Sequence, residues 1–97
     1  MTTDEMIDLF TADNDEYLQF DRVQAKRATR PDLHAFMLLN ELVPGDSDIV
    51  SGAGHDEIWL GISTEELAAI VTPEQVIELH RCGVRYDSSV DCLAMFV

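Results

Sequence analysis

PDLHAFMLLNELV, residues 31–43, is the stretch that decides the fold, because apolar side chains occupy eight of its positions after the proline. Pro31 suits the first position of a helix, where its missing N–H costs no hydrogen bond, and the Pro-Gly pair at 44–45 ends the helix. The apolar side chains cover most of the circumference, which predicts a helix buried on more than one side. We therefore expect this helix at the centre of the core, with Phe36 and Leu39 almost fully buried.

Two β-hairpins are predicted on the C-terminal side of this helix, over residues 48–62 and 84–97. In the first hairpin, the flexible sequence SGAG at 51–54 predicts the bend. The strand that follows alternates apolar and polar side chains, which is typical of one buried and one open face. The second hairpin is expected to turn at residues 87–90.

Sequence patterns that start or end helices occur between the two hairpins and at the N-terminus. The sequences STEE at 63–66 and TPEQ at 72–75 both have the pattern of a capping box. Gly83 is expected to end the second of these helices in a left-handed conformation. A short N-terminal helix is predicted over residues 3–10, with Thr3 as its N-cap.

Residues 17–28 fit two conformations. A helix would place Arg22, Lys26 and Arg30 on one face at i, i+4 spacing, and a short strand over residues 17–23 is about as compatible with the pattern. The remaining elements predict an α+β fold in one domain, residues 1–97. In it, a small antiparallel sheet of about three to five strands, built from two hairpins, packs against about three to four helices.

The formal net charge of −13 is the strongest compositional signal. Such a surface should repel DNA, RNA and anionic lipid, and it should attract cationic partners. The one basic cluster, Arg22, Lys26, Arg27 and Arg30, is expected to pair with the protein's own acids. An alternative is that the acidity serves only solubility, because a single lysine and more Asp than Glu also fit a salt-adapted or generally acidic proteome.

The sequence lacks a run of about 18 apolar residues, which a membrane span needs. The first ten residues have neither the basic nor the apolar region of a secretory signal. We therefore expect a cytoplasmic protein that does not contact a membrane. Cys82 and Cys92 suit that compartment as free, unreactive thiols.

The sequence predicts no catalytic residue, no metal ligand and no cofactor, because it contains no established motif for them. His55-Asp56-Glu57 is the most polar cluster, but adjacent strand residues point to opposite faces, which favours a solvated hairpin over an acid–base or metal site. His34 is expected to be a core histidine bonded to the backbone. His80 and Cys82 are two residues apart on a helix, so they do not face each other.

Six residues are candidates for binding a partner: Glu65, Glu66, Glu74, Glu78, Glu57 and Trp59. The first four lie on the two capped helices and could form a linear acidic surface. Glu74 and Glu78 repel each other at i, i+4 spacing by about a few tenths of a kcal/mol, which Arg81 or a cationic partner could relieve.

Trp59 falls on the open face of the first hairpin, between Glu57 and Gly61. If helices cover that face, the ring belongs to the core. If they do not, it is an exposed aromatic side chain beside an acid and a bare glycine, which is typical of a binding anchor.

Three stretches resemble short acidic open reading frames of phage and prophage type: RPDLHAFMLLNELVPG (30–45), HDEIWLGIS (55–63) and TPEQVIELHRCGVRYDSSVDCLAMF (72–96). The resemblance carries no catalytic motif, so it assigns no residue a role. What it implies is a context in which small proteins bind host proteins and acidic ones sometimes mimic DNA.

The sequence therefore predicts a non-enzymatic acidic domain that binds a basic host protein. A narrower form of this hypothesis is a DNA-mimic inhibitor of a nucleic-acid-binding host protein. The alternative is a structural or assembly protein that forms a homodimer through an apolar face such as that around Trp59. An enzyme ranks third.

Overall fold

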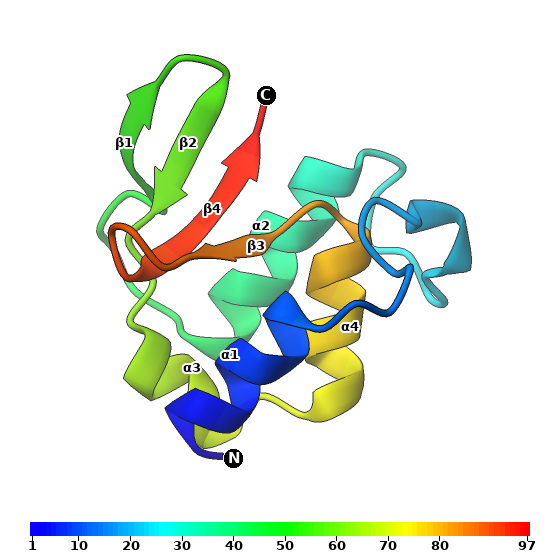
Figure 1. Cartoon of the computed structure of the whole chain (residues 1–97). Helices are drawn as coiled ribbons and strands as arrows, with labels where there is room; N and C mark the ends of the chain where they lie inside the picture. Colours follow the sequence, from blue (N-terminus) through cyan, green and yellow to red (C-terminus); the bar gives the residue numbers. More distant parts are fainter.

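The chain forms four α-helices, one 3₁₀ turn and a four-stranded sheet (Figure 1). The computed structural model describes all residues 1–97. The helices and the turn are α1 (Thr3–Thr11), η1 (Phe20–Arg22), α2 (Pro31–Leu42), α3 (Thr64–Ile70) and α4 (Pro73–Arg81). The strands are β1 (Val50–Gly54), β2 (Glu57–Leu60), β3 (Arg85–Asp87) and β4 (Cys92–Phe96). The predicted α+β fold, a small sheet packed against helices, is confirmed.

The sheet has the strand order β1-β2-β4-β3, and every neighbouring pair is antiparallel. Both predicted hairpins form, and the pairing of β2 with β4 joins them into one sheet, with Leu60 opposite Leu93 and Trp59 opposite Ala94. Leu60 and Leu93 therefore share the face that packs on the helices, while Trp59 lies on the other face.

The bend of the first hairpin was predicted at the wrong place. Residues 51–54 belong to strand β1, and the chain turns at His55 and Asp56, where Asp56 has φ 55°. Gly54 is needed for a close approach instead of a bend, because a Cβ there would lie 2.9 Å from Cη2 of Trp59. The second hairpin turns close to the predicted position, after Asp87.

Side-chain caps start α1, α3 and α4, whereas α2 begins at Pro31 without one, and only the Ser63 half of the capping box predicted at residues 63–66 forms. Thr72 and Gln75 form the reciprocal capping box of α4, and Ser63 accepts a hydrogen bond from the Glu66 N–H at the start of α3. The N-cap of α1 is Thr2, not Thr3, because Glu5 stands three residues after Thr2 and completes a capping box with it.

The predicted left-handed end of α4 is confirmed, with φ 100° at Gly83. The N–H of Gly83 donates to the carbonyl oxygen of His80, and the N–H of Val84 donates to that of Leu79. These two hydrogen bonds define a Schellman motif, which satisfies carbonyl groups that the helix end would otherwise leave unpaired.

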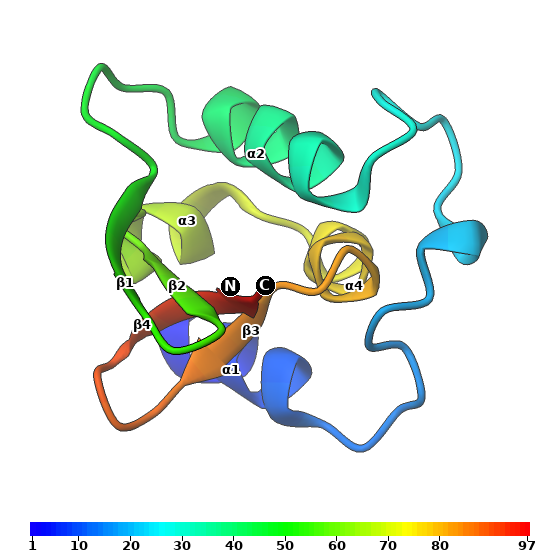
Figure 2. The same cartoon turned by 90° about the horizontal axis from the view of Figure 1, so that it is seen from above.

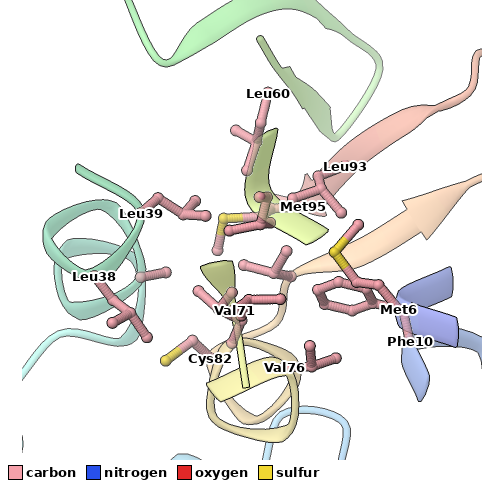
Figure 3. Packing of buried hydrophobic residues seen from close by; sticks show 14 of the residues in the cluster. Met6, Phe10, Leu38, Leu39, Leu60, Val71, Val76, Cys82, Leu93 and Met95 are labelled. Atoms are coloured by element: carbon pink, nitrogen blue, oxygen red, sulfur yellow. The ribbon is translucent and has the colours of Figure 1, made fainter. Parts of the chain in front are cut away.

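The core lies between the helices and the inner face of the sheet (Figure 3). One cluster of sixteen buried residues fills it, with contributions from every helix and from β2 and β4. The side chains labelled in Figure 3 converge from α1, α2, α4, β2 and β4 and from the residues that directly follow α3 and α4: Met6, Phe10, Leu38, Leu39, Leu60, Val71, Val76, Cys82, Leu93 and Met95. No helix combines the length and the apolar character that crossing a lipid bilayer requires.

Helix α2 is less buried than predicted. Leu39 has no exposed surface, but Phe36 is only half-buried, and Leu33 and Met37 are exposed by 46% and 42%. Figure 2 shows the reason, since α2 runs along one side of the molecule and no element covers its outer face. The expectation that this helix is buried on more than one side, with Phe36 almost fully buried, was therefore wrong.

We predict that Leu39→Ala lowers the free energy of unfolding by about 2–5 kcal/mol, because it leaves a cavity in the packed core. Met37→Ala on the same helix should change it by no more than about 0.5 kcal/mol, because that side chain faces solvent. Urea unfolding followed by circular dichroism measures both. Equal losses for the two variants would contradict the orientation of α2.

Candidate functional site

Most carboxylates of this protein have no basic partner. Ion pairs join four arginines to five acids, namely Glu16, Glu41, Glu57, Glu78 and Asp87. Since the chain has 19 acids, 19 − 5 = 14 carboxylates remain without an ion-pair partner. The excess negative charge therefore lies at the surface and is not neutralised within the fold.

The basic cluster behaves only partly as predicted. Arg22 pairs with Glu16 at 2.6 Å, and Arg27 pairs with Glu41 at 2.6 Å. Lys26 instead donates from Nζ to the carbonyl oxygen of Val23, and Arg30 forms no ion pair. Pairing with the protein's own acids is thus confirmed for two of the four cations and wrong for the other two.

Three of the four predicted acidic residues on the capped helices are accessible. Glu65 and Glu66 in the first turn of α3 and Glu74 in the first turn of α4 are exposed and form no ion pair. The positive end of each helix dipole favours a carboxylate at these positions. This part of the surface can meet a cationic partner without breaking any contact inside the fold.

Glu78 is different, because the fold uses it internally. Its Oε2 accepts a hydrogen bond from Nε2 of His34 at 2.6 Å and lies 3.5 Å from Nη1 of Arg27. Arg27 therefore offsets the repulsion between Glu78 and Glu74. Arg81, which the sequence suggested for that role, binds Glu16 instead.

His34 is a fully buried core histidine, as predicted. Its Nδ1 accepts a hydrogen bond from the backbone N–H of Arg27 at 3.0 Å, so the ring proton is on Nε2 and points at Glu78. This chain of hydrogen bonds ties the segment before α2 to both α2 and α4.

Trp59 matches neither of its two predicted environments. It lies on the sheet face that the helices leave open, but the ring is half-buried over the bare backbone of Gly52 and Gly54. Its Nε1 donates to Oδ2 of Asp87 at 3.3 Å. Hydrogen bonds from the Ser89 hydroxyl and N–H and from Trp59 lower the pKa of Asp87 to about 2. The indole therefore packs within the sheet and is not a free anchor.

Glu57 lies on the same open face and is also engaged. Its Oε2 binds Nη2 of Arg85 at 2.5 Å, and the Arg85 guanidinium stacks 4.0 Å from the Phe96 ring centroid. His55 and Asp56 are exposed in the turn, so the polar cluster 55–57 does not converge. Across the protein, no group of three His, Cys, Asp or Glu side chains is placed to hold a metal ion.

The two cysteines are free thiols. Burial raises the pKa of Cys82 to about 12, with a further contribution from the charge of Glu78. Burial also raises the pKa of Cys92. Because the thiolate is the reactive form, neither side chain is activated as a nucleophile.

Residues 12–28 connect α1 to α2, and the sequence did not predict the conformation of residues 17–28. Apart from η1, this segment is irregular, so both predictions for residues 17–28 were wrong. Three non-glycine residues have positive φ angles, which neither a right-handed helix nor a strand contains: Asp15 (57°), Leu18 (61°) and Ala25 (45°). A left-handed leucine is unfavourable by about 1–2 kcal/mol, so contacts elsewhere must hold it.

Those contacts are to the end of α4. The N–H of Leu18 donates to the carbonyl oxygen of His80, and Cδ2 of Leu18 lies 2.9 Å from the place where a Cβ on Gly83 would be. Glu16 bridges Arg22 and Arg81 with its two oxygens, each at 2.6 Å. The segment and the end of α4 thereby line an open polar hollow of about 530 Å³ beside His80.

We predict that Glu78→Ala lowers the free energy of unfolding by about 1–3 kcal/mol, because it leaves the His34 Nε2–H buried without an acceptor. Glu78→Gln removes the same charge but keeps an acceptor oxygen, so it should lower the free energy of unfolding by less than Glu78→Ala does. Thermal and urea unfolding compare the two variants. If the two variants are equally stable, Glu78 has no internal role, and it is again a candidate for binding a partner.

Comparison of the chain with known proteins finds no matching family model, no matching curated protein and no matching solved structure. No alignment of homologues adds residue conservation. The roles of individual residues therefore rest on the contacts, burial and charges described above.

Proposed function

We propose that this chain is a non-enzymatic binding protein whose acidic surface meets a basic region of another protein. The observation that supports the proposal is the set of fourteen carboxylates without an ion-pair partner. An excess of one charge accelerates encounter with an oppositely charged partner and discourages association with nucleic acids and anionic lipid.

Glu65, Glu66 and Glu74 are the carboxylates that we expect to contribute most. They are exposed, they lie in the first turns of two consecutive helices, and no internal ion pair competes for them. Glu57 and Glu78 are not expected to contribute, because binding a partner would cost their pairing with Arg85 and Arg27.

A narrower form of the proposal is a phage-type DNA mimic that inhibits a nucleic-acid-binding host protein. Such mimicry needs carboxylates arranged along one face at the spacing of duplex phosphates. The unpaired carboxylates are distributed over the helices, the 3₁₀ turn and the loops, from Asp4 in α1 to Asp91 beside β4, and none lies in a strand. This distribution supports general electrostatic attraction more than a phosphate-by-phosphate imitation of DNA.

The proposal predicts that the triple variant Glu65→Lys, Glu66→Lys, Glu74→Lys loses a basic partner while remaining folded. Electrostatic steering acts mainly on the association rate, and salt screens it over about 10 Å at 0.1 M. Affinity capture from cells that carry the gene, with quantitative mass spectrometry at rising salt, measures the loss. Melting temperatures are measured alongside, because each lysine near a helix start costs about 0.3–1 kcal/mol.

The matched control is Asp21→Lys, Asp32→Lys, Asp56→Lys, which changes the net charge equally at exposed, unpaired positions outside α3 and α4. It avoids Asp46 and Asp48, because these two residues line a hollow together with Glu66. Loss of the same basic protein with both triple variants supports attraction by overall charge. Loss with the glutamate variant alone locates the contact on α3 and α4. If both variants capture the same proteins as wild type, the acidity serves solubility and the proposal is wrong.

A second candidate function, a homodimeric assembly protein, is favoured by an apolar groove. The groove has a volume of about 430 Å³ and runs between α2 and the C-terminal end of β4. Eight of its ten lining residues are hydrophobic, including Phe36, Ile58 and the strongly exposed Leu18, Phe96 and Val97. Apolar surface of this kind in one place is typical of an association site.

If this groove joins two copies, Phe96→Asp should abolish a dimer that wild-type protein forms, whereas Val90→Asp, at an exposed apolar residue in the β3–β4 turn, should leave it intact. Sedimentation velocity over a range of concentrations measures both. Added salt should strengthen the dimer, since it screens repulsion between two copies of charge −13, whereas it should weaken binding to a basic partner. Wild-type protein that stays monomeric at all concentrations and salts excludes the assembly function.

A further inference from the structure

One ring nitrogen of His80 forms a hydrogen bond within the protein, and the other does not. The side chain is nearly buried, with 6% of the residue exposed. Nδ1 lies 2.9 Å from the carbonyl oxygen of Val84, and because a carbonyl can only accept, the Nδ1 atom carries the proton. In the neutral ring, Nε2 is then an acceptor, and no protein donor reaches it. Nε2 is not one of the fully buried polar atoms that lack a partner, so it keeps some exposed surface and is open to a ligand.

His80 lines the hollow of about 530 Å³ between residues 12–22 and the end of α4. In Figure 1 this segment is the blue loop beside the orange end of α4. Besides His80, the hollow is lined by Ala12, Asp13, Asn14, Asp15, Tyr17, Gln19 and Arg22. The Tyr17 ring lies 5.2 Å from the His80 ring, tilted by 51°. The hollow therefore combines an aromatic face, a free imidazole nitrogen and two exposed carboxylates, those of Asp13 and Asp15.

The charges around the hollow favour a cation over an anion. The two nearby arginines, Arg22 and Arg81, share the single carboxylate of Glu16, so these three groups together carry one net positive charge. Asp13 and Asp15 have no ion-pair partner, and their two negative charges bring the net charge of these five groups to −1. A ligand that donates several hydrogen bonds and carries positive charge is complementary to these groups.

We propose that this hollow is a binding site for a guanidinium group. A guanidinium is planar, presents five N–H donors and stacks on aromatic rings, so it can face Tyr17 while donating to Nε2 of His80 and to the Asp13 and Asp15 carboxylates. An ammonium group is a compact, strongly hydrated point charge and uses the aromatic face less well. The inference rests on the proposed function for its biological partner, because an arginine of a basic protein is the guanidinium that such a surface would meet.

The test is an NMR titration of the purified chain, without any protein partner, with agmatine and with putrescine. These two compounds carry the same charge, and they differ in that agmatine has a guanidinium where putrescine has an ammonium. Imidazole ¹⁵N shifts are followed at about pH 8, above the range in which histidine ordinarily gains a proton. Agmatine should move the His80 Nε2 resonance saturably and leave those of His34 and His55 unchanged. Putrescine should bind at least about tenfold more weakly, which corresponds to one charge-assisted hydrogen bond.

Variants separate the site from general charge. Asp13→Asn with Asp15→Asn should weaken agmatine binding at least about tenfold, and asparagine tolerates the left-handed conformation at position 15. The matched control, Asp46→Asn with Asp48→Asn, removes the same charge elsewhere and should weaken binding less than about twofold at 0.1 M salt. His80→Asn keeps a donor for the Val84 carbonyl but lacks the Nε2 acceptor, so it should abolish binding if it remains folded.

A capped tripeptide, acetyl-Gly-Arg-Gly-amide, distinguishes the two sources of a guanidinium. Binding of the tripeptide as strongly as agmatine supports a site for an arginine of a partner, whereas binding of agmatine alone supports a site for a free guanidinium compound. The absence of a saturable His80 shift, equal binding of putrescine, or equal losses in the two aspartate double variants would each overturn the proposal. Because no partner protein is present, this result is independent of the capture experiment with the Glu65, Glu66 and Glu74 variant.

Discussion

The left-handed turn at Gly83 is the constraint on which the rest of this structure depends. It ends α4 with a Schellman motif and sends the chain directly into β3, so it connects the helical layer to the sheet. The same turn carries the Val84 carbonyl that fixes the His80 ring. A side chain at position 83 would meet Leu18, so the absence of a Cβ also allows the irregular segment to pack on this corner.

The few basic residues of this protein hold together the parts that lack regular structure. Arg22 and Arg81 bind the two oxygens of Glu16, and Arg27 connects Glu41 of α2 to Glu78 of α4. Exposed ion pairs contribute little singly, and Glu41 is 61% exposed, but these pairs share carboxylates or arginines and so act as networks. Four of the five arginines are thereby used inside the fold, and the surplus carboxylates are left to face solvent.

Two surfaces with opposite physical character follow from this arrangement. The acidic surface suits encounter with a basic protein, while the apolar groove beside Phe96 suits association of copies of the chain. Salt should weaken binding to a basic protein and strengthen the association of two acidic copies, so a salt titration distinguishes the two kinds of contact. The polar hollow at His80 is a third feature, and it differs chemically from both because it combines a nearly buried imidazole with an aromatic ring and two exposed carboxylates.

The sequence by itself determined the elements that local chemistry specifies: the capped helices, the two hairpins, the left-handed end at Gly83 and the negative charge. Capping, periodicity and turn propensity act within a few residues, so they can be read without the fold. Tertiary structure decided where α2 lies, that Gly54 makes room for Trp59, and that Glu78 serves His34 and not a partner. It also brought His80 beside Tyr17 and Asp15, more than sixty positions earlier in the chain. Such contacts depend on packing between distant segments, which no local pattern encodes.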